Sequence, residues 1–298
     1  MEKQELLKQF AKPEDKLLVS KIYDKIKFTH NRNQIQTTSF LDGYEQTVVE
    51  KFLKLCQEKN FLLEGGFPEA ERKMLFLFPD KLENLLSKNE TLQEAQKVEE
   101  KSKIEKVQEV EKTQDKDSMI ISKFIKVIGI TLPKELQGSY HHREYLGGLM
   151  KLGIEREKIG DIIVNEQGAD ILVQSDIASF FLSHLPDLTR FQKAQISQKE
   201  ITELKIEQIK KESMVILVPQ FRLDVVLSEI LHLSRRKASD FIEQERVFVN
   251  YELKTKNATT LKQGDILTIR GKGKYEIGEI LSQTAKGKFR LEVKKYVS

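Results

Sequence analysis

Four consecutive residues in the last quarter of the chain, Ser234 to Lys237, combine a helix cap with three positive charges. Serine is a favoured N-cap residue, so Arg235, Arg236 and Lys237 would form the first turn of a helix. A helix N-terminus favours acidic side chains by roughly 0.3–1 kcal/mol each, and three cations conflict with this preference. Because the free backbone amides of such a turn attract phosphate, we predict a phosphate-binding site, with a solvated basic turn as the alternative.

A second basic element, Arg270-Gly271-Lys272-Gly273-Lys274, follows in the sequence. Glycines between cations let the backbone approach a ligand closely, and the cations supply charge-assisted hydrogen bonds. No strand-then-helix context surrounds these glycines, so the element is not a dinucleotide-binding loop. A flexible basic loop without a fixed partner is the alternative. Since two basic elements occur in the same region, we favour phosphate contacts for both.

Positive charge is concentrated in the last part of the 298-residue chain. Residues 220–298 hold 16 lysine and arginine residues against 10 acidic ones, whereas the rest of the chain holds 34 against 36. Clustered positive charge is typical of a protein that binds the phosphate backbone of nucleic acids. No apolar run approaches the roughly 18–20 residues that span a bilayer, and no secretory signal is visible. We therefore expect a cytoplasmic protein without a membrane partner.

Residues that could support catalysis or bind metal form no recognisable set. Adjacent histidines such as His141 and His142 point about 100° apart on a helix, unlike the i, i+4 pair that closes on one metal ion. The triplet Arg222-Leu223-Asp224 is similar to the segment around the catalytic aspartate of pseudouridine synthases, but an acid in a first helical turn also suits the helix dipole. No glycine-rich methyltransferase loop and no catalytic triad is found. We expect a protein that is not an enzyme and that has no cofactor, metal or small-molecule substrate.

Two helices and two strands must position the basic elements. Apolar residues recur at i, i+3, i+4, i+7 and i+8 over residues 223–231, which predicts an amphipathic helix. A second helix follows the Ser234 cap. Residues 246–250 and 266–270 predict strands, the second of which begins after a Gly-Asp turn.

Three regions precede these elements. Residues 1–88 predict a small α+β domain with a short buried strand at residues 74–78. In residues 89–118 half of the side chains are charged and none is aromatic, glycine or proline, so we expect a disordered linker or insertion. Residues 119–205 predict the order β-α-β-β-α-β, and a charged helical connector is expected at residues 200–212.

The order β-α-β-β-α-β is that of the ferredoxin-like fold, which RNA-recognition domains share. RNA-recognition sheets usually stack bases on aromatic side chains of their strands. The predicted strand at residues 169–173 has no aromatic residue. Any base stacking by this domain would therefore need another surface.

The C-terminal residues resemble a known RNA-binding module. Five segments are similar to the S4 RNA-binding domain in their order and spacing. They are Phe221-Arg222-Leu223-Asp224-Val225-Val226-Leu227, Leu233-Ser234-Arg235, Val247-Phe248-Val249-Asn250, Gly264-Asp265 and Arg270-Gly271. The resemblance implies an S4 domain at residues 219–281 that grips structured RNA, followed by a basic C-terminal extension at residues 282–298. The RNA-binding residues that it implies are Arg222, Ser234, Arg235, Arg236, Lys237, Lys254, Arg270, Lys272 and Lys274.

Upstream segments narrow the resemblance further. Thr38-Ser39-Phe40-Leu41-Asp42, Ala70-Glu71-Arg72-Lys73, residues 142–150 and residues 152–163 are similar to the YlmH family, which comprises bacterial S4-domain proteins often encoded near cell-division genes. The resemblance implies an α+β multidomain fold with an RRM-like central domain. For Glu71-Arg72-Lys73, an exposed RNA contact and a solvated turn both stay open.

Similarity to this family implies a non-catalytic role on the ribosome. The expected partners are ribosomal RNA and tRNA on large ribosomal subunits obstructed by peptidyl-tRNA, in ribosome-associated quality control. Two alternatives stay open: an RNA-modifying enzyme, resembling a pseudouridine synthase or a methyltransferase, with an unrecognised site, and an interaction protein for cell division.

Overall fold

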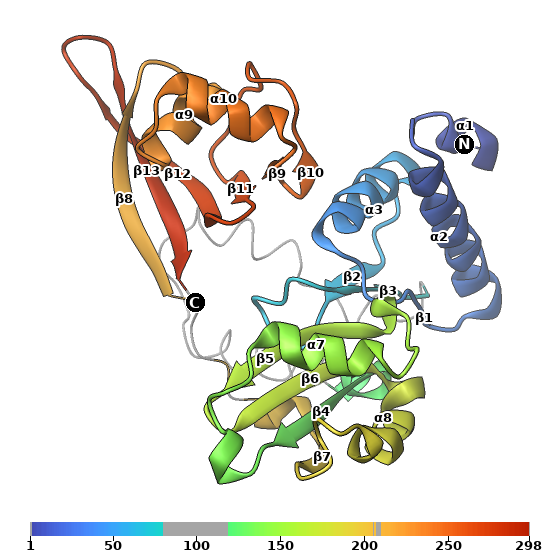
Figure 1. The fold of residues 1–298 in the computed structure, drawn as a ribbon. Helices are drawn as coiled ribbons and strands as arrows, with labels where there is room; N and C mark the ends of the chain where they lie inside the picture. Colours follow the sequence, from blue (N-terminus) through green and yellow to red (C-terminus); the bar gives the residue numbers. More distant parts are fainter. Residues whose placement is uncertain (1, 80–118, 205, 207–209, 298) are drawn as a thin grey trace, which may run out of the picture. The chain divides into compact units, whose positions relative to one another are not determined.

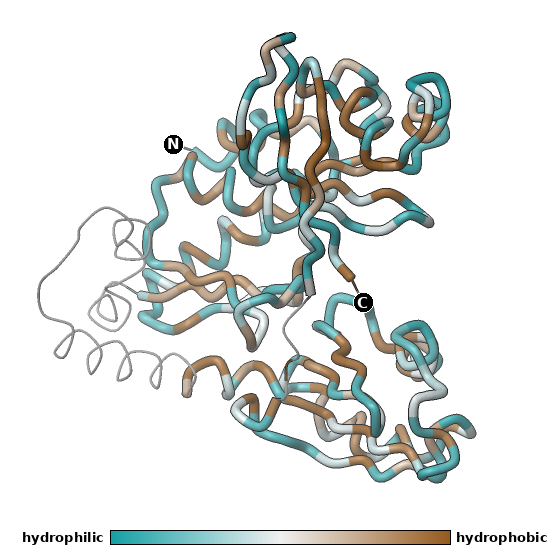
Figure 2. The backbone as a smooth tube through the Cα atoms, turned by 90° about the vertical axis from the view of Figure 1, so that its left-hand side faces the viewer, coloured by the Kyte–Doolittle hydropathy of each residue, from teal (hydrophilic) through white to brown (hydrophobic). Residues whose placement is uncertain are grey.

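The computed structural model describes residues 2–79, 119–204, 206 and 210–297, so the linker predicted at 89–118 lies outside the described residues. The chain forms two compact units, Met1–Ile206 and Glu207–Ser298 (Figure 1). Hydrophobic and hydrophilic residues alternate along the trace (Figure 2). Within the described ranges, no helix is both long and apolar enough to cross a membrane.

The N-terminal part of the first unit packs helices on a small antiparallel sheet of strand order β1-β3-β2. A capping box opens α3, in which Asp42 accepts a hydrogen bond from the Glu45 amide at 2.9 Å and the Glu45 carboxylate accepts one from the Asp42 amide at 2.8 Å. The predicted buried strand at residues 74–78 is confirmed as β3, whose residues are all buried. The elements are α1 (Lys3–Leu7), α2 (Pro13–Arg32), β1 (Gln36–Thr37), α3 (Gly43–Cys56), β2 (Phe61–Glu64) and β3 (Met74–Leu77).

The central part of the first unit confirms the predicted order β-α-β-β-α-β. Its antiparallel sheet has the strand order β5-β6-β4-β7. The strands and α-helices are β4 (Ile125–Thr131), α7 (His142–Met150), β5 (Ile159–Asn165), β6 (Gly168–Gln174), α8 (Ala178–His184) and β7 (Gln195–Lys199). Short 3-10 helices are η2 (Lys134–Leu136), η3 (Arg156–Lys158), η4 (Ser175–Ile177), η5 (Leu185–Asp187) and η6 (Ile201–Glu203).

Both faces of the central sheet are covered near its middle. On one face, α7 and α8 enclose a hydrophobic core that includes Tyr145. On the other face, Ile125 and Leu172 pack in a common core with Phe40 of the N-terminal part. Gly66 permits this close approach, because a Cβ atom there would lie 2.5 Å from Cδ2 of Leu172. Since RNA-recognition domains stack bases on an open sheet face, the middle of this sheet cannot serve that purpose.

Segments that resemble the YlmH family meet where the N-terminal part contacts the central sheet. The Arg72 guanidinium donates hydrogen bonds to the backbone oxygens of Phe40 at 2.8 Å and Ile159 at 3.1 Å. The Asp161 carboxylate accepts hydrogen bonds from the amides of Glu71 at 2.6 Å and Arg72 at 3.2 Å. Burial raises the pKa of Asp161, although these amides and the Arg72 charge oppose the shift. Arg72 is therefore engaged within the unit rather than placed in a solvated turn.

The second unit is built on an antiparallel sheet of six strands in the order β10-β9-β11-β12-β13-β8. Helices α9 and α10 pack on one face, where Leu227, Ile242 and Val293 belong to a single buried core. The elements are β8 (Lys210–Val218), α9 (Leu223–Ile230), α10 (Arg235–Glu243), β9 (Val247–Val249), β10 (Glu252–Leu253), β11 (Ile266–Ile269), β12 (Gly273–Gln283) and β13 (Phe289–Val297).

The helical connector predicted at residues 200–212 is wrong. Only the 3-10 turn η6 is helical there among the described residues, and Lys210–Val218 forms strand β8. Strand β8 pairs with β13 from Val218 opposite Phe289 to Lys210 opposite Val297. A partner some eighty residues away in the chain stabilises the strand, and a local sequence pattern does not contain that information.

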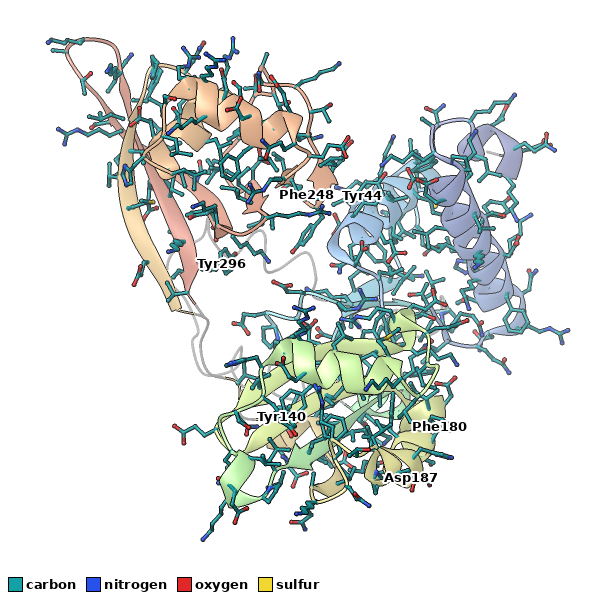
Figure 3. The ribbon with its side chains drawn as sticks, in the orientation of Figure 1. Tyr44, Tyr140, Phe180, Asp187, Phe248 and Tyr296 are labelled. Atoms are coloured by element: carbon teal, nitrogen blue, oxygen red, sulfur yellow. The ribbon has the colours of Figure 1, made fainter. Side chains whose placement is uncertain are left out.

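The face of this sheet that points away from α9 and α10 carries aromatic side chains outside the core. In β9, Val247 and Val249 are buried, so Phe248 between them points to the opposite face. Tyr296 of β13 is likewise only partly buried. Figure 3 shows Phe248 and Tyr296 on the side of the sheet away from the two helices.

Candidate nucleic-acid interface

The cap predicted at Ser234 is present. Ser234 has extended backbone angles, and its side-chain oxygen accepts a hydrogen bond from the Lys237 amide at 3.3 Å. Arg235, Arg236 and Lys237 follow in the first turn of α10, and all three are exposed. The first amides of a helix have no helical acceptor, so three cations and a helix N-terminus meet at one solvent-exposed point.

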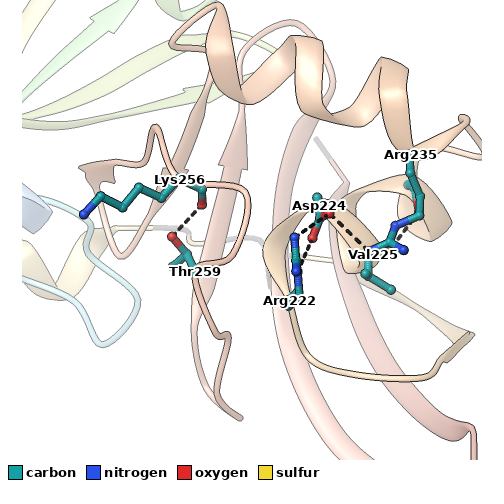
Figure 4. A network of polar contacts seen from close by, with 7 residues as sticks. Arg222, Asp224, Val225, Arg235, Lys256 and Thr259 are labelled. Atoms are coloured by element: carbon teal, nitrogen blue, oxygen red, sulfur yellow. Dashed lines mark hydrogen bonds and ion pairs between the residues drawn. The ribbon is translucent and has the colours of Figure 1, made fainter.

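A buried carboxylate joins this point to the start of α9. Asp224 is 5% exposed, and its Oδ1 and Oδ2 accept hydrogen bonds from Nε and Nη2 of Arg222 at 3.0 and 3.1 Å. Oδ2 also accepts a hydrogen bond from Nη2 of Arg235 at 3.2 Å (Figure 4). The structure thus brings Arg222 and Arg235, which are thirteen positions apart in the chain, onto one acid.

Both arginines keep hydrogen-bonding capacity for a ligand. The side chains of Arg222 and Arg235 are 37% and 57% exposed, whereas that of Asp224 is 8% exposed. A guanidinium has five N–H donors, and Asp224 occupies two from Arg222 and one from Arg235. Asp224 therefore holds each guanidinium group in a fixed orientation. The remaining N–H donors face solvent, in a geometry that suits phosphate.

A nearby loop holds the start of α9 in place. The Leu223 amide donates to the backbone oxygen of Thr259 at 2.8 Å, and the Asp224 amide donates to that of Asn257 at 3.3 Å. Thr259 in turn donates from its hydroxyl to the backbone oxygen of Lys256 at 2.8 Å. Because these first amides of α9 already have partners, phosphate would be bound at α9 by the Arg222 side chain and not by the helix N-terminus.

A second basic group lies at the turn between β11 and β12. The Arg270 guanidinium lies 4.8 Å from the ring centre of Phe248, and the Arg246 side chain donates to the backbone oxygen of Arg270 at 2.9 Å. Arg246 also stacks on Phe241, at 4.4 Å. Lys272 is exposed at the tip of the turn. The sequence did not single out Arg246, although its position immediately before a strand and its cationic type were visible.

The two remaining predicted residues, Lys254 and Lys274, each have a partner close by. Lys254 donates to Glu252 at 2.5 Å, so its charge is locally balanced. Lys274 lies on the aromatic side of the sheet, where its Nζ is 3.3 Å from the Tyr251 hydroxyl. Among the described residues, no hydrogen bond or ion pair links the Arg222–Arg235 group to the Arg270 group. The predicted residues therefore include two basic groups, one at the start of α9 and α10 and one at the turn between β11 and β12.

The described residues contain no cluster of three or more histidine, cysteine, aspartate and glutamate side chains that could hold a metal ion. The polar atoms gathered at the start of α9 and α10 are mainly guanidinium donors around one acid. Such an arrangement can bind phosphate oxygens and position a folded nucleic acid.

Comparisons with known proteins agree with this chemistry. Residues 221–267 match the S4 domain, and residues 123–205 match the family described as the putative RNA-binding domain in YlmH. The S4 match runs from the start of α9 into β11 and includes Arg222, Asp224 and Arg235. The fold and the basic surface therefore define an RNA-binding protein with an S4 domain.

A curated relative matches almost the whole chain. The chain is 25% identical over 285 residues to "Ribosome-associated protein quality control protein P2" of Bacillus subtilis, which covers 95% of this chain and 96% of the relative. A solved structure, "Cell division protein ylmH from Streptococcus pneumoniae", is 19% identical with a TM-score of 0.42, and covers 66% of this chain and 98% of its own. The two domain matches occur in sequence order, and the chain is similar to the YlmH family along almost its whole length.

Proposed function

We propose that this protein is a non-catalytic RNA-binding factor of the cytoplasm that acts on the ribosome. Its targets are ribosomal RNA and tRNA on large ribosomal subunits obstructed by peptidyl-tRNA. The observation that carries the proposal is the set of cations at the start of α9 and α10, in which buried Asp224 orients Arg222 and Arg235. The relative named as a ribosome-associated quality control protein supports the ribosomal part, since the match extends along 95% of the chain.

The environment of Asp224 supports a binding role over a pseudouridine-synthase-like reaction. A nucleophilic carboxylate must reach its substrate, whereas Asp224 is 5% exposed and accepts hydrogen bonds from two arginines. Its position in the first turn of α9 also suits the helix dipole. The acid therefore acts as a positioning group for cations.

The test is sedimentation of cell extract through a sucrose gradient, together with crosslinking and sequencing of RNA bound to the full-length protein. We expect the protein to sediment with free large ribosomal subunits and to crosslink to large-subunit ribosomal RNA and tRNA. Crosslinks scattered over messenger RNA, or a protein that remains at the top of the gradient, would contradict the ribosomal role.

Two double variants test the basic surface. Arg235→Glu with Arg236→Glu should abolish RNA association, but the first change also places an acid beside Asp224. Arg236→Glu with Lys237→Glu leaves the ion pair with Asp224 intact and should also abolish association with folded RNA. The matched control is Lys54→Glu with Lys59→Glu, which makes the same charge change at exposed positions of the N-terminal part. Retained binding of folded RNA by a folded Arg236→Glu, Lys237→Glu protein would overturn the assignment of this surface.

A further inference from the structure

The outer face of the C-terminal sheet, which points away from α9 and α10, combines aromatic rings with cations. Strand pairing places Phe248 opposite Thr268, and Thr268 opposite Lys274, in one row across β9, β11 and β12. Tyr296 of β13 pairs with Lys211 of β8 on the same face. We refer to Phe248, Tyr251, Arg270, Lys274, Tyr296 and Lys211 as the aromatic–cation face.

Each ring on this face lies close to a cation. The Arg270 guanidinium lies 4.8 Å from the Phe248 ring centre. Lys274 Nζ lies 5.3 Å from the ring centre of Tyr251 and 4.9 Å from that of Tyr296. Lys211 Nζ lies 4.7 Å from the Tyr296 ring. The rings and charges therefore alternate along the surface, at distances typical of cation–π contacts.

The acidic residues of this face are already paired. Glu276 accepts hydrogen bonds from Lys211 at 2.7 Å and from the Tyr296 hydroxyl at 3.4 Å. Glu292 accepts one from Ser213 at 2.6 Å and lies 3.6 Å from Lys294. Glu276 also fixes the direction of the Tyr296 ring. The cations exceed the acids, which makes the face attractive to an anionic partner.

The backbone at Tyr251 is held in an unfavourable conformation. Asn250 and Tyr251 have φ values of 49° and 64° in the tight turn between β9 and β10. Glycine is preferred at the second of these two positions, because a left-handed backbone strains a residue with a bulky side chain. A tyrosine in its place supplies the ring that contacts Lys274. Backbone strain is often found at binding surfaces, where the strained residue supplies a side chain that contacts a ligand.

We propose that the aromatic–cation face binds unpaired RNA nucleotides. Bases stack on Tyr296 and on the Phe248–Arg270 pair, and Lys274 and Lys211 bind the intervening phosphates. The chemistry fits a single strand, because aromatic rings and guanidinium planes stack on bases that are free of a duplex. By contrast, the ring of Phe221, which precedes Arg222 in the chain, packs against the hydrophobic core, and the cations at the start of α9 and α10 suit the phosphates of folded RNA.

This inference rests on the proposed RNA-binding function and adds a second kind of RNA contact to it. The middle of the central sheet is buried on both faces. The C-terminal sheet, in contrast, is covered by α9 and α10 on one face, and its other face exposes the aromatic–cation residues to a partner. Phe248 and Tyr251 lie within the S4 match at residues 221–267, whereas the other four residues of the face lie outside it.

The test compares two labelled RNA probes bound to the full-length protein, an oligouridine single strand and a hairpin with a fully paired stem, by fluorescence anisotropy at one salt concentration. Tyr296→Leu and Phe248→Leu should each weaken binding of the single strand roughly tenfold, since stacking on one ring is lost. The conservative control Tyr296→Phe keeps the ring and should change the affinity by less than about twofold. Hairpin binding should remain unchanged in all three variants.

Tyr251→Gly tests the same face with a change that relieves backbone strain, because glycine tolerates the left-handed conformation. It should raise the thermal midpoint and weaken binding of the single strand. Unchanged single-strand affinity in Tyr296→Leu, Phe248→Leu and Tyr251→Gly would overturn the inference, as would equal losses for both probes. A wild-type protein that binds the hairpin and not the single strand would overturn this inference alone, whereas binding of neither probe would contradict the proposed function.

Discussion

Oδ2 of Asp224, in the first turn of α9, accepts a hydrogen bond from Nη2 of Arg235, in the first turn of α10, over a distance of 3.2 Å. Three cations in the first turn of α10 interact unfavourably with the helix dipole, and this contact explains how one of them is tolerated. Arg235 has an internal acidic partner, which offsets its unfavourable interaction with the helix dipole. Arg236 and Lys237 are exposed in the same turn, and no hydrogen bond or ion pair joins their side chains to another described residue. Phosphate from a ligand would therefore be bound chiefly at these two residues and at the outward donors of the two fixed arginines.

Asp224→Asn should weaken RNA binding about tenfold even though it makes the surface more positive. Without the carboxylate, Arg222 and Arg235 are no longer held, and ordering a long side chain on binding costs about 0.5–1.5 kcal/mol each. The free energy of unfolding should also fall by about 1–3 kcal/mol, because two charge-assisted hydrogen-bonded pairs are lost. Anisotropy titrations with hairpin RNA and urea unfolding measure the two effects.

The matched control is Asp240→Asn, which removes the same charge from an exposed position of α10. If general electrostatics governed binding, both variants would bind RNA more tightly than the wild type. Tighter binding by Asp224→Asn would show that this acid repels phosphate more than it orients the arginines.

Arg236→Gln and Lys237→Gln should each change the salt dependence of binding. Every phosphate that a cation neutralises releases bound counterions from the nucleic acid, so the slope of log K against log salt should become shallower by about 1 for each variant. The slope is measured from affinities at several salt concentrations. Lys54→Gln, at an exposed position in the N-terminal part, should leave it unchanged. An unaltered slope for Lys237→Gln would remove that residue from the interface.

Gly66→Ala should destabilise the first unit by about 2–4 kcal/mol. Its φ of 98° strains any residue with a Cβ atom, and that atom would lie 2.5 Å from Cδ2 of Leu172. Gly138→Ala separates the two causes, because Gly138 has a φ of 74° with no atom within 4 Å of its added Cβ. The control should cost only about 1 kcal/mol. Equal losses in urea unfolding would mean that the contact with Leu172 contributes nothing.

The ferredoxin-like order of strands and helices in the central part can be predicted from local sequence patterns. The segment that covers the second face of its sheet cannot. Residues Ala169 to Val173 of β6 are all buried, and their sequence lacks the alternation of a strand with one solvated face. This pattern indicates a strand buried on both sides. It does not indicate which segment supplies the second layer, because Phe40 and Gly66 are about a hundred residues away and their contacts form only in the folded chain.

The candidate site also has one part that could be predicted from the sequence and another part that depends on the folded structure. The helix cap at Ser234 and the exposed cations that follow it could be predicted, since both depend on residues adjacent in the chain. The link through Asp224 requires two helices to pack at a particular angle, and the sequence explained the acid only by the helix dipole. The contact between Lys274 and Tyr296 depends on the pairing of β12 with β13. Such register is set by packing across the whole sheet.

The ion pair between Glu276 and Lys211 makes part of the stability of the C-terminal unit dependent on pH. The hydrogen bond from Lys211 is the largest cause that lowers the pKa of Glu276 below its ordinary value. An acid whose pKa is lower in the folded state than in the unfolded state stabilises the fold above the unfolded pKa, near 4.3 for glutamate, and loses this effect as the pH falls through the folded pKa. The wild type should therefore melt above Glu276→Gln at neutral pH, with a difference that shrinks toward zero as the pH falls below the ordinary glutamate pKa of about 4.3.

Thermal unfolding of the two proteins at several pH values measures this difference. Glu279→Gln is the control, because Glu279 is exposed on the same strand and its own side chain has no hydrogen bond or ion pair with another described residue. At neutral pH its difference from the wild type should be smaller than that of Glu276→Gln, because an exposed side chain without a partner contributes little to stability. A Glu276→Gln difference that stays constant with pH would mean that the carboxylate stabilises the sheet by packing, since protonation would then leave its contribution unchanged.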